Sequence, residues 1–490
     1  MSLHAQLPPQ TIQLLRQQKR KSTLTSLLIS IFTIFLVSIA LTFFLVKGQS
    51  ITNEELTVIP QIHQSKDPHS LPATVSPSTR KPSPPANQFS VSLLALPTEN
   101  HLQIPAPEFI NEIPSGNLGT SENKVDSSWI SIAGSSDPEI LPTEQRKRCS
   151  KADRLARLKS QGGSEASEEA VLESLRWLQK NQNPDGSWGS GKPVAMTGLS
   201  LLAYLGHCET PTSPEFGNTV TEGMLYLVNS SLQQNGKLAS NLRDKHWCYE
   251  HAIATYALAE SYLFCRSQNL TALTLQLAEV LQSGTEWILN HQTKAGGWDY
   301  HYATDNRPGD TSIVAWQLQA LKAASQSNLP FPKIDRAISR GLSFLKDCQH
   351  QSGGFGYRLN KRPVGSANNH FTLTGAGSLC FQQHKGVQNK TARKGIHYLT
   401  QNTHFNFAAR EHNLYEHYYA SQAFINHGGK EWSDYNQHVL TQVLQNQQPD
   451  GSWPHSTGPG AHSHPVYATA LATLMLEVYY RYLPGTVSSQ

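Results

Sequence analysis

Polar and aromatic residues gather at the beginning of several apolar segments of this chain. The tripeptide Tyr-Glu-His occurs twice in such a position, at residues 249–251 and 415–417. If the segments are helices that run in one direction around a ring, their first residues meet at one rim. Helix N-termini present unpaired N–H groups and a partial positive charge, so this rim suits a carboxylate or a diphosphate. The candidate rim residues are Glu250, His251, Asp310, His370, Glu416, His417 and Tyr467.

A structural role is the competing interpretation of each candidate. The helix dipole alone favours an acidic residue in the first turn, and Asp310 before Thr311 is a typical helix cap. Internal duplication also explains the repeated tripeptide. Below the rim, aromatic residues of the same segments are expected to line an apolar pocket, namely Tyr256, Trp316, Tyr418 and Tyr419.

A short phrase of glycine followed by a large aromatic residue recurs between the segments that must position this rim. Glycine adopts backbone angles that other residues resist, and the aromatic ring buries a large apolar area, so the phrase predicts a pinned turn. Each phrase follows an amphipathic stretch with helical spacing, such as Val171, Leu175 and Leu178. Two further copies of the turn, at 234–238 and 403–405, are incomplete, and together with four complete copies they give six units. The four complete copies are Gln182–Trp188, Lys294–Trp298, Gln351–Phe355 and Gln447–Trp453.

Each turn leads into a second segment that is rich in small residues and apolar on most sides, which predicts a buried inner helix. The sequence therefore predicts an all-α fold, an (α/α)6 toroid of six helix pairs, with an open solenoid as the alternative. The expected inner helices are 195–207, 250–265, 310–325, 370–384, 415–428 and 466–481.

The N-terminal part of the chain has a different character. Leu24 to Val46 is an uncharged apolar run of 23 residues, long enough for one transmembrane helix. The basic residues before it predict that 1–23 lie in the cytoplasm and the rest outside. A cleaved signal peptide is the alternative, although its apolar core is normally about 7–15 residues. Residues 47–145, rich in proline and serine, predict a disordered linker, 146–164 a basic lead-in and 165–485 the toroid.

Charge and cysteine content exclude several classes of function. The net charge is +4, and the basic clusters at 16–21 and 146–159 belong to no fold that reads nucleic acid. The six cysteines include no C-x-x-C pair. One or two disulfides are compatible with an extracytoplasmic domain, but Cys208, Cys265, Cys348 and Cys380 are expected to be buried thiols. His455, His462 and His464 lie in a loop without a carboxylate, so neither a metal nor a cofactor is expected.

The repeats resemble those of prenyltransferases and squalene cyclases. The phrase Gln-x-x-x-Gly-Ser-Trp resembles the turn motif of terpenoid cyclases, over about 165–485. The six pairs match the toroid of squalene–hopene cyclases and of protein prenyltransferase β subunits. The sequences of residues 249–260, 310–317 and 476–484 resemble most those of uncharacterised membrane-anchored bacterial proteins. This resemblance implies a periplasmic toroid and supplies no activity.

The resemblance also implies two catalytic patterns, and both are incomplete. Squalene–hopene cyclases protonate an alkene with an Asp of an Asp-x-Asp-Asp-Thr segment. Here only its last Asp remains, as Asp310, and the place of the proton donor falls on Gly309. Protein prenyltransferases hold zinc through Asp, Cys and His, and the matching positions are Asp310, Ser312 and Ala468. The Gly-Cys-Gly-Glu-Gln segment of complement-type thioester domains is absent.

The sequence therefore favours a toroid that binds a ligand or a partner in its central cavity without either known reaction. Two alternatives stay open. One is an enzyme that acts on an isoprenoid or another lipid through the rim residues. The other is a scaffold whose outer helices bind proteins of the cell envelope.

Overall fold

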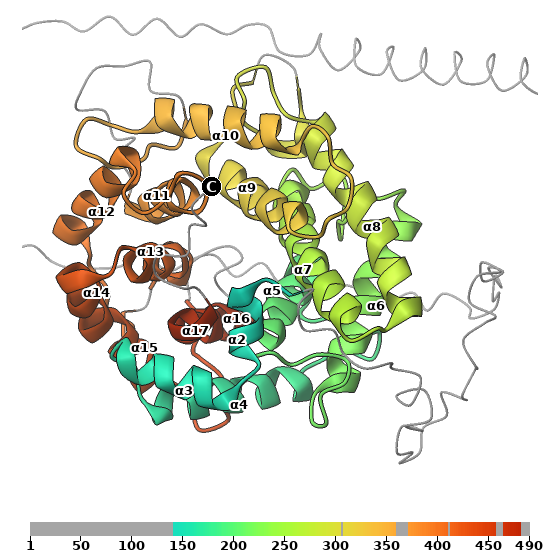
Figure 1. Ribbon diagram of the computed structural model, residues 1–490, viewed down its shortest axis with the longest axis horizontal. Coiled ribbons are helices and arrows are strands. Elements are labelled where there is room, and N and C mark those ends of the chain that lie inside the picture. Colours follow the sequence, from blue (N-terminus) through green and yellow to red (C-terminus); the bar gives the residue numbers. More distant parts are fainter. Residues whose placement is uncertain (1–140, 305–306, 359–370, 410–411, 457–463, 482–490) are drawn as a thin grey trace, which may run out of the picture. The chain divides into compact units, whose positions relative to one another are not determined.

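The computed structural model describes residues 141–304, 307–358, 371–409, 412–456 and 464–481, where helices are joined by turns (Figure 1). The prediction of an all-α fold is confirmed for these residues. The predicted transmembrane helix, residues 1–23 and nearly all of the predicted linker lie outside them, as does His370. Within the described residues, no helix is both long and apolar enough to cross a membrane.

Six helices form the inner layer of the toroid, and each contacts the next around a closed ring. The ring closes because the last inner helix contacts the first, which excludes the open solenoid. Nearly all their residues are buried, in agreement with their apolar, small-residue composition. The inner helices are α5 (Pro193–Gly206), α7 (Trp247–Ser267), α9 (Thr311–Ser325), α11 (Phe371–Lys385), α13 (Leu414–His427) and α16 (Pro465–Leu476).

The outer layer alternates with the inner one along the chain (Figure 1). Each outer position packs against the two inner helices that flank it around the ring, so the two layers interlock. Five positions hold one helix each, and the sixth holds two short helices around a π-helical turn. The elements are α4 (Glu165–Lys180), α6 (Gly217–Gln233), α8 (Thr271–Asn290), α10 (Ile334–Cys348), α12 (Lys390–Asn402), and α14 (Gly429–Tyr435), η5 (Asn436–Leu440) and α15 (Thr441–Gln445).

One glutamine in each complete turn ties two outer helices together. The Gln349 side-chain amide donates to Gly353 O in its own turn and to Thr391 O of α12, both at 2.9 Å. We call this arrangement the glutamine clasp. At the second and third turns, the clasp residue lies two positions before the phrase Lys294–Trp298 or Gln351–Phe355, at Gln292 and Gln349. The clasp residues are Gln182, Gln292, Gln349 and Gln447.

The last clasp joins the end of the ring to its beginning. The Gln447 amide donates to Gly451 O at 3.0 Å and to Ala170 O of α4 at 2.7 Å. Gly451 has a φ of +90°, and a Cβ there would overlap the carbonyl oxygen of Glu173, so this turn requires glycine. Trp453 is buried and donates through Nε1 to Val443 O at 2.6 Å. The Gly-Ser-Trp phrase thus works as a joint between neighbouring units.

Among the residues that the structure describes, two helices precede the ring and one follows it. They are α2 (Thr143–Arg148), α3 (Lys151–Ser160) and α17 (Val478–Arg481), and α17 contacts both others. A disulfide joins Cys149, after α2, to Cys208, after α5. The expectation that Cys208 is a buried free thiol is wrong, because α2 docks beside the turn that contains it. The other cysteines in the described residues, Cys248, Cys265, Cys348 and Cys380, are buried and free.

Candidate functional site

Asp310 caps α9 at the edge of the ring and is fully buried. Its Oδ1 accepts hydrogen bonds from the backbone N–H of Ser312 at 2.8 Å and from the Ser312 hydroxyl. Its Oδ2 accepts from the Tyr300 hydroxyl at 3.0 Å. The carboxylate is therefore held by donors on both oxygens, and the capping role expected for Asp310 coexists with a place in a larger polar cluster.

Three tyrosine hydroxyls, from three different elements, converge on this carboxylate. Tyr300 belongs to the short helix η4 (Tyr300–Tyr302), and its hydroxyl is hydrogen-bonded to that of Tyr357, in the turn after α10. The Tyr249 hydroxyl, from α7, lies 2.9 Å from the Ser312 hydroxyl. Burial, followed by the charge of Asp310, raises the pKa of Tyr249, so the phenol stays protonated. All three tyrosines keep part of their surface exposed.

Tyr415 of α13 and Tyr467 of α16 complete this group of aromatic side chains. Burial raises the pKa of Tyr415, and the nearby Tyr467 and Asp310 raise it further. Both side chains are partly exposed. We call the five residues Tyr249, Tyr300, Tyr357, Tyr415 and Tyr467 the tyrosine mouth. They lie at or near the beginnings of inner helices, so the structure places Tyr467 and Asp310 at the same end of the ring.

Cationic side chains border the tyrosine mouth on one side. Arg307 and Arg358 each place a guanidinium nitrogen 3.8 Å from a carboxylate oxygen of the buried Asp299. The side chains of these arginines are 52% and 46% exposed, so water screens both ion pairs. The Lys245 ammonium lies 5.3 Å from the centroid of the Tyr300 ring. The edge therefore presents positive charge next to phenol rings.

The two candidate glutamates are held by their neighbours near this end of the ring. The buried Glu250 accepts from the hydroxyl and the N–H of Ser240, and Lys192 lies 3.9 Å away. Glu416 accepts from the Thr372 hydroxyl at 2.8 Å. Burial raises the pKa of both carboxyls. Neither glutamate hydrogen-bonds to Asp310.

The two candidate histidines lie between the layers instead of with Asp310. The buried His251 ring accepts from Leu238 N–H at 3.0 Å and donates to Gly284 O of α8 at 3.0 Å. His417 is buried too, and its Nδ1 lies 3.0 Å from the Tyr435 hydroxyl of α14. Burial lowers the pKa of His251 to about 4 and that of His417 to about 3. Both imidazoles are therefore neutral groups that connect an inner helix to the outer layer. His370, the remaining candidate, lies outside the described residues.

Sequence reasoning missed Tyr300 and Tyr357, although a signal for them was present. Each is the second residue after the aromatic of a turn phrase, in Trp298-Asp-Tyr300 and Phe355-Gly-Tyr357. A turn that pins its aromatic beneath the inner helices also carries the next residues toward the helix N-termini. A tyrosine at this offset in two consecutive units therefore marks the end of the ring at which Asp310 lies.

The backbone explains why the place of the cyclase proton donor is a glycine. Gly309 has a φ of +111°, and a Cβ there would lie 2.9 Å from Trp298 N and 3.0 Å from Trp298 O. No side chain fits without movement of the turn, so an aspartate is excluded from this backbone. The Ser312 hydroxyl is bonded to Asp310, and Ala468 is 1% exposed within α16. In the described residues, no three His, Cys, Asp or Glu side chains are grouped to hold a metal ion.

Packed aromatic rings occupy the middle of the ring where a pocket was expected. Trp316 of α9 stacks on Tyr418 with centroids 5.6 Å apart and meets Tyr419 edge-on at 5.5 Å. Tyr418 and Tyr419 have no exposed surface, and Trp316 is 3% exposed. A void large enough for water would leave exposed area on its walls, so these three side chains fill their part of the interior. Access from the tyrosine mouth is therefore shallow at this point.

Comparison with known proteins gives similarity of fold alone. No family model matches the chain, and no curated protein matches its sequence. Among solved structures, it is similar to the α-1,6-mannanase of Salegentibacter sp. HEL1_6, at 11% identity and a TM-score of 0.47 over 64% of this chain and 98% of that chain. The type II terpene cyclase MstE of Scytonema matches at 11% identity and a TM-score of 0.41 over 64% and 98%. A glycosidase matches at 11% identity and a TM-score of 0.42, over 65% of this chain and 98% of that chain.

These similarities assign no family, and identities of this size say nothing of a shared activity. The toroid itself follows from the helix contacts of the chain. The resemblance of the repeats to prenyltransferases and squalene cyclases stays a prediction.

Proposed function

We propose that this protein is a membrane-anchored binding protein whose toroid lies outside the cytoplasm and holds a hydroxyl-rich ligand, such as a sugar chain, at the tyrosine mouth. The apolar run Leu24–Val46 supplies the anchor and the proline-rich segment after it the tether. The Cys149–Cys208 disulfide supports this location, since disulfides persist in oxidising compartments.

The observation that carries the proposal is the convergence of phenol groups at the mouth. Three hydroxyls meet at Asp310 and Ser312, while five tyrosine rings keep exposed surface. Tyrosine combines a rigid apolar face with a polar tip and loses little entropy on binding, so it is enriched at recognition surfaces. Phenols and bordering cations offer donors to ligand hydroxyls and anionic groups.

The same geometry favours binding over either family reaction. Both oxygens of Asp310 already accept hydrogen bonds, so the group acts as an anchor for the phenols instead of an acid aimed at an alkene. The packed Trp316, Tyr418 and Tyr419 leave no void for a long isoprenoid chain between them. A shallow, polar ligand therefore suits the mouth better than a buried lipid.

Binding is tested by titrating the full chain in detergent micelles with neutral and acidic hexose oligosaccharides, followed by tryptophan and tyrosine fluorescence. Removing one hydroxyl by Tyr300→Phe or Tyr357→Phe is expected to weaken binding by about 5- to 10-fold, the value of roughly one hydrogen bond. Tyr226→Phe, on the outer helix α6, is the matched control and should leave binding unchanged.

Two results would reject the proposal in favour of the alternatives. An isoprenoid or another lipid that co-purifies in equal amount, and that is lost with Asp310→Ala, would support the lipid-acting enzyme. Saccharide binding that is absent, or equal in Tyr300→Phe and wild type, would remove the mouth as the site. An envelope protein that binds the full chain through its outer helices would then support the scaffold.

A further inference from the structure

The opposite end of the ring, at the C-termini of the inner helices, is covered by the helices that flank the ring. Arg148, at the end of α2, donates through Nη1 to Leu205 O of α5 at 3.2 Å and to Glu260 of α7 at 3.0 Å. Arg481 of α17 lies 3.3 Å from the other carboxylate oxygen of Glu260 and from the Tyr256 hydroxyl. Glu260 is thus bridged between the helix before the ring and the helix after it.

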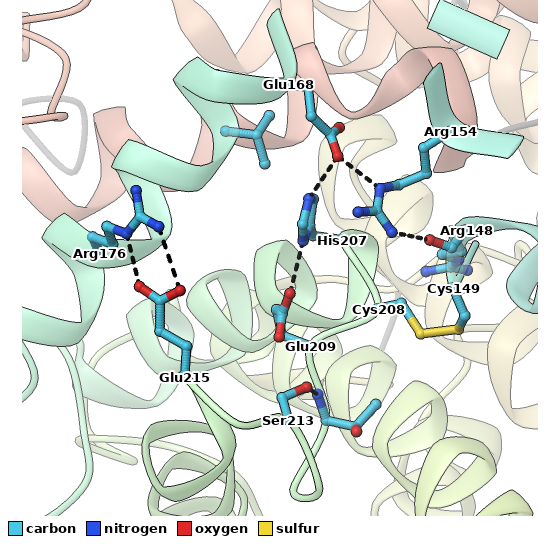
Figure 2. A network of polar contacts seen from close by, with 12 residues as sticks. Arg148, Cys149, Arg154, Glu168, Arg176, His207, Cys208, Glu209, Ser213 and Glu215 are labelled. Atoms are coloured by element: carbon cyan, nitrogen blue, oxygen red, sulfur yellow. Dashed lines mark hydrogen bonds and ion pairs between the residues drawn. A yellow bond between two sulfur atoms is a disulfide. The ribbon is translucent and has the colours of Figure 1, made fainter. Parts of the chain in front are cut away.

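A second set of buried ionic contacts holds α3 (Figure 2). Arg154 donates to Glu168 of α4 at 2.9 Å and to Arg148 O at 2.7 Å. The His207 ring lies 3.1 Å from the same Glu168 oxygen and 2.9 Å from Glu209. Burial opposes the charge on His207, but the hydrogen bonds to these two glutamates outweigh it and raise the pKa. Charges buried in this way are stable only while their partners stay in place.

Glu477, between α16 and α17, makes this end of the ring dependent on its cover. The side chain is fully buried, and neither carboxylate oxygen has a hydrogen-bond partner among the described residues. Burial raises its pKa well above the usual range. Together with Glu168 and Glu260 it forms an acidic end wall that α2 and α3 shield from water.

Apolar packing holds α2 and α3 on the ring only weakly, and a disulfide adds a covalent attachment. Along its ten residues α3 buries only Arg154 and Leu158. Polar contacts at its end are the hydrogen bonds from Trp432 to Gln161 O and from Asn436 to Gly162 O. The disulfide joins α2 to α5, and Cys149 is exposed, so a reductant can reach it (Figure 2).

We propose that α2 and α3 form a plug over the acidic end of the ring and that Cys149–Cys208 is the latch that keeps it closed. A dithiol opens the latch: two electrons and two protons pass to the cystine, the S–S bond breaks to give two cysteine thiols, and the dithiol becomes a disulfide. The plug then leaves the ring, and Glu168, Glu260 and Glu477 face water as a binding surface for a cationic segment, of which Arg148 and Arg154 are the resident example.

Hydrogen exchange of the full chain in detergent micelles tests the latch, with and without dithiothreitol. A cross-link over a loop of 59 residues restricts the open state by about three orders of magnitude at most. Reduction is therefore expected to speed exchange in α2 and α3 by up to about 1,000-fold. Peptides around Trp298 and Asp310 should be unchanged. Carbodiimide labelling of Glu260 and Glu477 should appear only after reduction.

Variants separate the latch from the ionic contacts. Cys149→Ser should behave without reductant as the wild type does with it. Glu260→Gln, with the disulfide intact, should keep exchange of α2 and α3 slow, and reduction should then open the plug further than in the wild type. The proposal is overturned if reduction leaves α2 and α3 protected, if it raises exchange equally throughout the toroid, or if the oxidised protein yields no peptide linked through Cys149 and Cys208.

Discussion

The closure of the ring can be measured by removing the last glutamine clasp. Gln447→Ala deletes an amide that donates to Gly451 O within its turn and to Ala170 O, 277 residues away. Each such hydrogen bond contributes about 1 kcal/mol net, so the variant should lose about 2 kcal/mol of unfolding free energy. Gln447→Glu should lose more, because a carboxylate then faces two carbonyl oxygens and donates to neither.

Gln349→Ala is the matched control because it removes the same pair of bonds at a joint between consecutive units. Urea unfolding of the full chain in micelles, followed by circular dichroism, gives both losses from the midpoints and slopes. In a closed ring the two variants lose equal amounts. In an open chain Ala170 would lie far from the last turn, so Gln447→Ala would forfeit only its local bond. A loss of about half that of Gln349→Ala would therefore refute the closed toroid.

Further predictions concern the turns, the mouth and the interlayer histidines. Gly353→Ala, at a φ of +102° and against the carbonyl of Lys394, should lose about 3 kcal/mol in the same urea assay, and a loss under about 1 kcal/mol would contradict the turn geometry. Asp310→Asn places an amide N–H₂ opposite one of the donors from which the Asp310 carboxylate accepts a hydrogen bond, so the free energy of unfolding should fall by about 2 kcal/mol. An unchanged urea midpoint would mean that the cluster is not formed. Burial lowers the pKa of His251 to about 4, so the unfolded chain takes up a proton on this imidazole before the folded chain does as the pH falls. The free energy of unfolding should therefore fall by up to about 3 kcal/mol between about pH 6.5 and 4. The His251→Gln variant should be less stable at pH 7, and its free energy of unfolding should change less with pH over that interval. A pH dependence equal to that of the wild type would mean that another group causes it.

The inner helices could be predicted from sequence because they are apolar on every side. The expected segment 195–207 corresponds to α5, Pro193–Gly206, and 310–325 to α9, Thr311–Ser325. Such a pattern depends on burial alone and survives wide variation in individual residues. The turns between the helices could be predicted too, because each complete turn joins a glycine to an aromatic residue that must be buried.

The end of the ring that carries Asp310 and the tyrosine mouth was harder to predict, because periodicity does not say which side of a buried helix faces the axis. His251 and Tyr249 are two residues apart at the start of α7, yet one joins the outer layer and the other the mouth. Tyr300 and Tyr357 come from turns, whose path depends on the helices around them. The pairing of Cys149 with Cys208 depends on where α2 docks, which no spacing reveals.

Glutamine clasps hold four of the six joints of the toroid, including the joint between the last turn and α4, and this closure removes a problem that linear repeat proteins face. An open array ends in exposed apolar faces and needs specialised terminal repeats. Here α4 meets the last turn through the same bond that joins every complete joint, so no unit is terminal. The helices that flank the ring, α2 and α17, both bond to the same glutamate, Glu260. The ring contacts therefore do not depend on which joint is cut, and a circularly permuted toroid that is cut at another joint would rebuild the same ring.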